Sequence, residues 1–192
     1  MVKEPRPGRV KTRLGRSLGM TQAAWWFRHQ TQGLLRRLYD PRWALVLAVS
    51  PDVAGMNSRI WPVHLQRVPQ GRGNLGDRMA RLLSMPASGS VAIIGGDIPG
   101  IQRQHIARAF AALGAQDAVF GPSPDGGYWL VGLKNARKAP VTLFENVRWS
   151  SPHALSDSVA SLKDLRTAFV DVLQDVDTIE DLRMTARHTR AT

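Results

Sequence analysis

Apolar and polar residues follow two distinct periods along the chain. Between residues 21 and 39 the apolar side chains recur near helical spacing, and the continuous apolar run 44–49 comes next. This is the pattern of an amphipathic helix that leads into a buried strand. The same pattern predicts further strands at 63–68, 91–94, 118–120, 128–133 and 168–173, and helices at 77–84, 102–113 and 152–165. Because helices separate the strands, the sequence predicts an α/β fold with a doubly wound, mostly parallel sheet and helices on both faces.

The length of the chain is that of one domain. Its 192 residues are 43% apolar, which is enough to form a core without disulfides. No repeat, low-complexity segment or linker interrupts the pattern, so residues 1–192 are predicted to form a single domain. Only Met1, Val2 and Lys3 stand before the loop that begins near Pro5. The first strand of the sheet is therefore expected to be short or missing.

Two absences narrow the function. The chain has no cysteine, which excludes thiol catalysis and thiolate metal sites. No apolar run approaches the roughly 20 residues that span a bilayer, and the beginning of the chain is charged and proline-rich where a signal peptide would be apolar. A cytoplasmic protein without a membrane partner is expected.

The net charge of +11 allows two kinds of anionic partner. Nucleic acid is one, because neutralised phosphates supply most of its non-specific affinity. The cations, however, form separate groups with few interleaved aromatic residues for base stacking, at residues 3–16, 28–42, 67–81 and 183–190. This distribution favours a phosphate-rich small substrate over nucleic acid. A merely solvated basic surface is the alternative.

Residues 95–99 give the most informative motif. An apolar run ends here in Gly95, Gly96, Asp97, Ile98 and Pro99. Ligands bind at the carboxyl ends of the strands of an open parallel sheet, so Asp97 is well placed to hold a metal ion, and the glycines let phosphate or sugar approach the backbone. Alternatively, Asp97 caps the helix predicted to begin at 102.

The loop between residues 5 and 14 packs cations around a glycine turn. Pro7 and Gly8 form the predicted turn, and Lys11 and Arg13 follow it. Such a loop can bind a diphosphate or triphosphate through charge-assisted hydrogen bonds. A P-loop is excluded, because Val10 stands where that motif has glycine. The alternative is a basic, proline-stiffened arm.

Two later motifs also place acids after predicted strands. Asp125, Gly126 and Gly127 lie between two apolar runs, either as a hairpin turn or at the same end of the sheet as Asp97. Asp175 and Asp177 follow the last predicted strand. Magnesium takes one or two protein carboxylates, so Asp97 with either of these would suffice. Alternatively, Asp177 or the next residue, a threonine, caps the following helix.

Two loops offer further contacts to a substrate. The segment 70–78 supplies backbone donors, an amide and cations at a helix start, which suits a nucleobase or phosphate. Its candidate residues are Gln70, Asn74, Gly76 and Arg78. Trp149 and Ser150 precede another helix, where the indole can line a sugar or base pocket. An ordinary capped loop and a core tryptophan are the alternatives.

Six motifs in this order resemble a bacterial family of GT-A-like proteins in the nucleotide-diphospho-sugar transferase superfamily. The resemblance covers nearly the whole chain and rests on P-R-P-G-R-V-K-T-R-L, Q-G-x-G-N-L-G-D-R-M, G-G-D-I-P, G-P-S-P-D-G-G-Y, L-F-x-x-V-R-W-S-S and D-V-D-T-x-E-D-L. A more distant resemblance is to molybdenum cofactor guanylyltransferase and phospholactate guanylyltransferase. Members of the family carry an apolar strand before the first motif, where this sequence has only a few residues.

The resemblance implies roles for the acids and cations. Lys11 and Arg13 would hold nucleotide phosphates, and Asp97 would bind a divalent metal, Mg²⁺ or Mn²⁺. Asp177 or Asp175 would be the second metal ligand. Asp125, Gly126 and Gly127 would shape the pocket of the acceptor, and Tyr128 beside them is a further candidate for substrate binding.

The sequence also bears on the reaction. GT-A glycosyltransferases commonly present a D-x-D pair to the diphosphate, whereas this chain has Gly95, Gly96 and Asp97 at that position, with one carboxylate. We therefore expect a magnesium-dependent nucleotidyltransferase, in which a phosphorylated small-molecule acceptor attacks the α-phosphate of a nucleoside triphosphate and pyrophosphate leaves. The first alternative is a glycosyltransferase that uses a nucleotide-sugar. The second is a non-catalytic basic binding protein with an incomplete nucleotide site.

Overall fold

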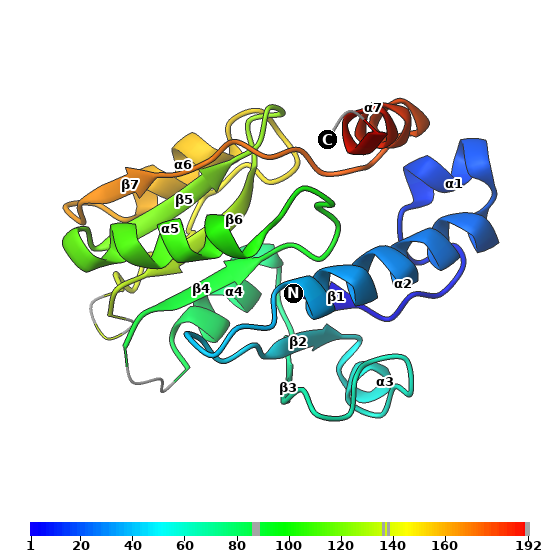
Figure 1. The fold of residues 1–192 in the computed structure, drawn as a ribbon. Helices are drawn as coiled ribbons and strands as arrows, with labels where there is room; N and C mark the ends of the chain where they lie inside the picture. The colour runs from blue at the N-terminus through cyan, green and yellow to red at the C-terminus, as the bar shows by residue number, and fades with distance from the viewer. Residues whose placement is uncertain (86–88, 136, 138, 191–192) are drawn as a thin grey trace. The chain divides into compact units, whose positions relative to one another are not determined.

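The computed structural model describes residues 1–85, 89–135, 137 and 139–190. Helices and strands alternate along them, which confirms the predicted α/β class (Figure 1). The chain divides into two compact units. Unit 1 contains Met1–Pro69, Gly96–Arg103 and Asp175–Thr192, and unit 2 contains Gln70–Gly95 and Gln104–Gln174. A single domain over residues 1–192 stays a prediction.

The sheet of unit 1 is parallel throughout. Its order is β1 (Val2–Lys3), β2 (Leu47–Ser50) and β3 (Arg67–Pro69), with Val2 paired to Val49. The two-residue β1 confirms that the first strand is short. Strands β2 and β3 begin three and four residues later than predicted. In the case of β3 the preceding residues form a turn, in which the amide of Leu65 donates to the carbonyl of Pro62 at 3.3 Å.

Four helices belong to unit 1. The predicted helix 21–39 is α2 (Met20–Arg37), and α7 (Ile179–Arg190) follows the capping signal after Asp177. Two short helices were not predicted, α1 (Thr12–Leu18) and α3 (Asp52–Met56). Their few residues cannot establish a helical period in the sequence.

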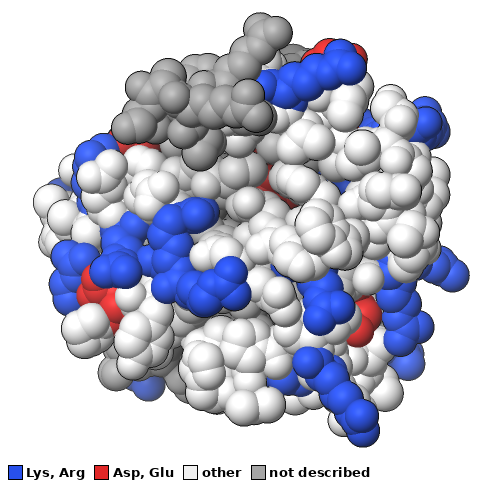
Figure 2. All heavy atoms as spheres, turned by 45° about the vertical axis from the view of Figure 1, so that its right-hand side comes forward, with Lys and Arg blue, Asp and Glu red and all other residues white. Residues whose placement is uncertain are grey.

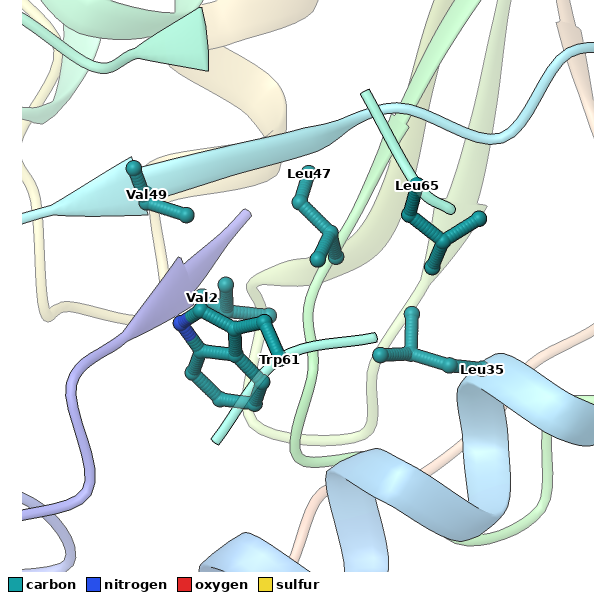
Figure 3. Packing of buried hydrophobic residues seen from close by; sticks show 6 residues of the cluster. All are labelled: Val2, Leu35, Leu47, Val49, Trp61 and Leu65. Carbon is teal, nitrogen blue, oxygen red and sulfur yellow. The ribbon is translucent and has the colours of Figure 1, made fainter. Parts of the chain in front are cut away.

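Three clusters of buried side chains lie among the described residues of unit 1, one of them formed by Val10, Ala24 and Phe27. The other two hold the sheet and the segments that carry the candidate site. The first of these two clusters packs the sheet against α2 and the loop before β3. Figure 3 shows the indole of Trp61 against Val2 in this cluster. The members of the cluster are Val2, Leu35, Leu47, Val49, Trp61 and Leu65. The second joins α1, α2 and the segment before α7 through Leu14, Ala23 and Val176, all without exposed surface. This second cluster fixes the residues that build the candidate site.

The sheet of unit 2 is mixed. Its order is β4 (Val91–Ile94), β6 (Tyr128–Leu133), β5 (Ala118–Pro122) and β7 (Thr167–Phe169). The predicted strands 91–94 and 128–133 are confirmed to the residue. Strand β6 is antiparallel to both neighbours because a tight hairpin joins it to β5, whereas β5 and β7 are parallel. Three of the five strand pairings in the described residues are thus parallel.

Helices cover both faces of this sheet, as predicted. They are α4 (Leu75–Leu83), α5 (Arg103–Ala115) and α6 (Ala154–Ser161). Only the first residue of α5, Arg103, belongs to unit 1. Tyr128 contacts Ser158 of α6, and the ring of Trp129 lies 6.2 Å from that of His105 in α5. Consecutive residues of a strand point to opposite faces. Helices α5 and α6 therefore lie on opposite sides of the sheet (Figure 1). No helix of the described residues is long and apolar enough to cross a membrane.

Candidate functional site

The site begins with a buried valine between two aspartates. The amide of Val176 donates to the carbonyl of Asp97 at 3.4 Å, and its side chain is fully buried between α1 and α2. Asp175 and Asp177 both direct a carboxylate oxygen to Lys11. The two acids therefore lie on one side of their segment, and the valine between them anchors that segment beside Asp97.

Helix α7 does not use Asp177 as its cap. Thr178 and Asp181 cap it reciprocally: the Thr178 amide donates to Asp181 at 2.8 Å, and the Asp181 amide donates to the Thr178 hydroxyl at 3.2 Å. The capping alternative thus applies to Thr178 and not to Asp177. The carboxylate of Asp177 remains available for the site.

Asp97 follows β4 in a loop that α2 holds in place. The hydroxyl of Thr31 donates to the carbonyl of Gly96 at 3.2 Å, and Arg37 donates to the carbonyls of Pro99 and Ile101 at 2.8 and 2.7 Å. A Cβ at Gly96 would meet the side chain of Val2 at 3.0 Å, so a larger residue here would force that side chain to shift. The carboxylate of Asp97 contacts Lys11 at 2.7 Å. The alternative, in which Asp97 caps the helix predicted at 102, is not tested by this contact and stays a prediction.

Lys11 lies where the three carboxylates meet. Its ammonium is 2.7 Å from Asp97 Oδ2, 2.6 Å from Asp177 Oδ1 and 3.7 Å from Asp175 Oδ2, and its side chain is only 5% exposed. Burial by itself lowers the pKa of Lys11, but the two close carboxylates outweigh burial and raise it above its ordinary value. Its backbone is left-handed, with φ 45°. Such strain persists where the surrounding structure imposes it, often at functional sites.

The cluster has the chemistry of a site for a hard cation. One ligand atom from each of Asp97, Asp175 and Asp177 lies within 4.8 Å of the others. Carboxylate oxygens are the donors that Mg²⁺ and Mn²⁺ prefer. The three side chains are 30–38% exposed, which leaves room for water or substrate oxygens. The Lys11 ammonium already lies among these oxygens, so the three carboxylates can surround a cation. Their chemistry therefore fits a divalent metal ion in the same place.

The other cations of the first loop are exposed. Arg13 is 3.4 Å from Asp177 and 67% exposed. Pro7 and Gly8 lie in an exposed turn, in which the amide of Arg9 donates to the carbonyl of Arg6 at 3.0 Å and Gly8 has φ 73°. Figure 2 shows Lys and Arg side chains in separate groups with uncharged surface between them. The loop therefore combines one buried cation with exposed ones.

The predicted acceptor residues belong to unit 2, where they form a hairpin turn. The amide of Gly127 donates to Asp125 at 3.0 Å, and Gly126 has φ 83°. A Cβ at Gly126 would overlap the backbone of Pro152. The hairpin alternative is confirmed, and the role of Asp125, Gly126 and Gly127 in acceptor binding stays a prediction.

Aromatic residues of unit 2 pack against neighbouring elements. The hydroxyl of Tyr128 lies 3.1 Å from that of Ser158, and burial raises the pKa of Tyr128 well above its ordinary value. The ring of Trp149 packs edge-on against Phe144, and both lie close to the Cα of Gly76. Ser150, the next residue, is exposed with φ 57°.

The loop before α4 is a capped loop. Asn74 and Asp77 form a capping box, and Arg78 donates to the carbonyl of Gly73 at 3.0 Å. The carbonyl of Gln70 accepts from Arg81 at 2.7 Å. In the neighbouring sheet, the amide of Gly95 donates to the carbonyl of Trp129 at 3.1 Å. These contacts are structural, and substrate binding by Gln70, Asn74, Gly76, Arg78, Gly95, Tyr128, Trp149 and Ser150 stays a prediction.

The structure adds positioning residues that the sequence analysis missed. Val176, Thr31 and Arg37 hold the segments that carry the aspartates. The D-x-D spacing of Asp175 and Asp177 was visible in the sequence, yet only the contact of Val176 with Asp97 brings it to the site. The site therefore has three carboxylates, where the motif at Asp97 alone indicated one.

Comparison with known proteins identifies the family. Residues 34–151, more than half of the chain, match the family DUF2064, which is described as "Uncharacterized protein conserved in bacteria". The chain belongs to this family. Among curated proteins, none matches the sequence significantly.

Solved structures confirm the fold of this DUF2064 protein. It is similar to a "putative nucleotide-diphospho-sugar transferase" from Desulfovibrio desulfuricans G20, with a TM-score of 0.84 and 29% identity over 97% of this chain and 84% of that one. A Mycobacterium sp. strain JC1 homologue of Mycobacterium tuberculosis Rv0371c has a TM-score of 0.56 at 16% identity, over 86% of this chain and 84% of that one, and shows the fold alone. The resemblance to the nucleotide-diphospho-sugar transferase superfamily is confirmed.

Proposed function

We propose that this DUF2064 protein is a divalent-metal-dependent transferase that acts on a nucleotide-diphospho-sugar and transfers the sugar to a small-molecule acceptor. The observation that carries the proposal is the convergence of Asp97, Asp175 and Asp177 within 4.8 Å. The expectation of nucleotidyl transfer rested on a single carboxylate at this point and on the basic, glycine-containing loop after the first strand. Three carboxylates, two of them in D-x-D spacing, remove the first of these arguments. The name of the Desulfovibrio neighbour also supports a nucleotide-sugar substrate.

Each residue of the site has a role in this proposal. Asp97, Asp175 and Asp177 would hold the metal ion, which supplies positive charge to the diphosphate as it becomes the leaving group. Arg13, exposed beside Asp177, would contact phosphate oxygens from the solvent side. In the reaction the bond between the sugar and the diphosphate breaks, a bond from the sugar to the acceptor forms, and the acceptor loses its proton.

A second candidate is the transfer of a nucleotidyl group from a nucleoside triphosphate to a phosphorylated acceptor. The segment after β1 favours it, because Arg6 and Arg9 are exposed there and Arg13, exposed at the start of α1, lies 3.4 Å from Asp177. A triphosphate has more charge than a diphosphate for these side chains to neutralise. The two reactions release different products, so one assay separates them.

The decisive experiment follows the leaving group. The protein is incubated with Mn²⁺, a mixture of small-molecule acceptors, and either nucleotide-sugars or nucleoside triphosphates. Release of nucleoside diphosphate from a nucleotide-sugar is expected, and the Asp97→Asn variant should lack it. Release of pyrophosphate from a triphosphate would favour the second candidate. If neither nucleotide binds in a metal-dependent way and only polyanions are retained at low salt, the protein is a basic binding protein and the proposal is wrong.

A further inference from the structure

We propose that Lys11 and the divalent cation occupy the three-carboxylate cluster in turn, so that the protein binds a metal–diphosphate complex as one unit and excludes the free metal ion. The inference rests on the proposed function and adds the form in which its substrate enters. It follows from three properties of Lys11: the position of its ammonium, the charges around it, and the hydrogen bond that holds its backbone.

The position of the ammonium makes the two cations mutually exclusive. Lys11 Nζ lies 2.6 and 2.7 Å from oxygens of Asp177 and Asp97. A magnesium ion lies about 2.1 Å from its oxygen ligands. A metal ion in contact with the same oxygens would therefore occupy nearly the same place as the ammonium. Lys11 must leave before the ion can bind.

The charges make this exchange unfavourable for a free ion. The cluster has three carboxylates and the buried ammonium of Lys11, whereas Arg13 reaches only Asp177, at 3.4 Å and from the solvent side. The amino group of Met1 also interacts with Asp97, but burial lowers its pKa to about 6, so it carries little charge at pH 7. A free metal ion would displace the ammonium into a place without an anionic partner. A diphosphate that arrives with the ion offers the ammonium new oxygens at once. The affinities for metal and diphosphate are therefore coupled through Lys11.

The attachment of Lys11 permits the exchange without unfolding. Its carbonyl accepts from the amide of Gly15 at 2.8 Å, which fixes the backbone at the start of α1. The four-carbon side chain can rotate while this anchor stays in place. The exchange is thus a change of side-chain conformation, from the carboxylates to the phosphate oxygens.

The test compares wild type with Lys11→Met, which keeps most of the length of the unbranched side chain but removes its charge. Arg16→Met is the matched control, because it removes an exposed cation from the same helix, α1, that has no role in the proposed site. Two affinities are measured by calorimetry: that for Mn²⁺ alone, and that for Mn²⁺ premixed with inorganic pyrophosphate. Lys11→Met should bind Mn²⁺ about tenfold more tightly and Mn²⁺–pyrophosphate about tenfold more weakly than wild type, since the competitor and the phosphate contact are lost together. Arg16→Met should leave both affinities unchanged.

The outcomes separate this inference from the function on which it rests. If neither wild type nor Lys11→Met binds Mn²⁺, the metal site and the proposed function are wrong. If both bind Mn²⁺ equally, the metal site stands and the exchange is wrong. If Lys11→Met binds Mn²⁺ more tightly but Mn²⁺–pyrophosphate as well as wild type does, Lys11 only repels the ion, and the exchange is again wrong. Lys11→Gln, measured in the same way, replaces Lys11→Met if that variant does not fold.

Discussion

Aspartates have different partners in the two units. In unit 2, Asp117, Asp157 and Asp171 each pair with one arginine, and these arginines are 54–67% exposed. In unit 1, Asp40 pairs with the exposed Arg42 in the same way, but Asp97, Asp175 and Asp177 share one lysine that is 5% exposed, and only Asp177 is also reached by an arginine, Arg13. Exposed one-to-one pairs contribute little to stability and need no further ligand.

The cluster of unit 1 is different because its charges do not balance. Three carboxylates around one ammonium leave negative charge that a further cation can neutralise. Like charges held close together repel one another and destabilise a folded protein. Such arrangements are therefore concentrated at functional sites. The comparison thus separates acids that have one balancing partner from acids that we propose to bind a cation, and variants in each unit can test it.

The largest expected effect is on metal binding by Asp97→Asn. Removing one of three anionic ligands should weaken Mn²⁺ binding about 100-fold, a loss of about 2.7 kcal/mol. Calorimetry measures the affinity, and circular dichroism checks that the fold is kept. Asp117→Asn in unit 2 is the control and should bind Mn²⁺ like wild type. An equal loss in both variants would contradict the distinction between the two kinds of aspartate.

The next effect, on stability, is expected for Gly126→Ala in the hairpin of unit 2. The residue has φ 83°, and its new Cβ would overlap the backbone of Pro152. The free energy of unfolding should fall by about 2–3 kcal/mol, from backbone strain and overpacking together. Chemical denaturation measures it, with Gly114→Ala in α5, where a Cβ meets nothing within 4 Å, as the control. A stable variant that binds acceptor poorly would instead favour the predicted role of Gly126 in the acceptor pocket.

A smaller loss of stability is expected for Lys11→Met in unit 1 when metal is removed. Without the ammonium, the three carboxylates repel one another, and the cost should be about 1–2 kcal/mol because all three are partly exposed. Denaturation in EDTA measures the loss, and added Mn²⁺ should restore the stability. If Mn²⁺ does not stabilise the variant, the carboxylates do not form a metal site.

Much of the fold, but only part of the site, was predictable from the sequence. Strands β4 and β6 were predicted to the residue because glycines and turn residues bound their apolar runs. Helix α1 was not, since its start has a left-handed lysine where a capping side chain is usual. The acids were each recognised after a strand. Their meeting depends on the contact of Val176 with Asp97, which joins distant segments and leaves no local pattern.

The smallest expected effect is on the pH dependence of stability in Asp157→Asn. Hydrogen bonds from Arg148 lower the pKa of Asp157 from its ordinary 3.8 to about 2. Because the folded-state pKa is lowered, the pair stabilises the protein above about pH 4, and this contribution is lost as the pH falls towards 2. The variant should therefore melt slightly below wild type at pH 7, with a difference that shrinks below pH 4. Thermal melts from pH 7 to pH 3 measure it. A difference independent of pH would show that the charge of the Asp157 carboxylate does not stabilise the protein. A change in Mn²⁺ affinity would show that Asp157 affects metal binding, which would contradict the comparison between the two units.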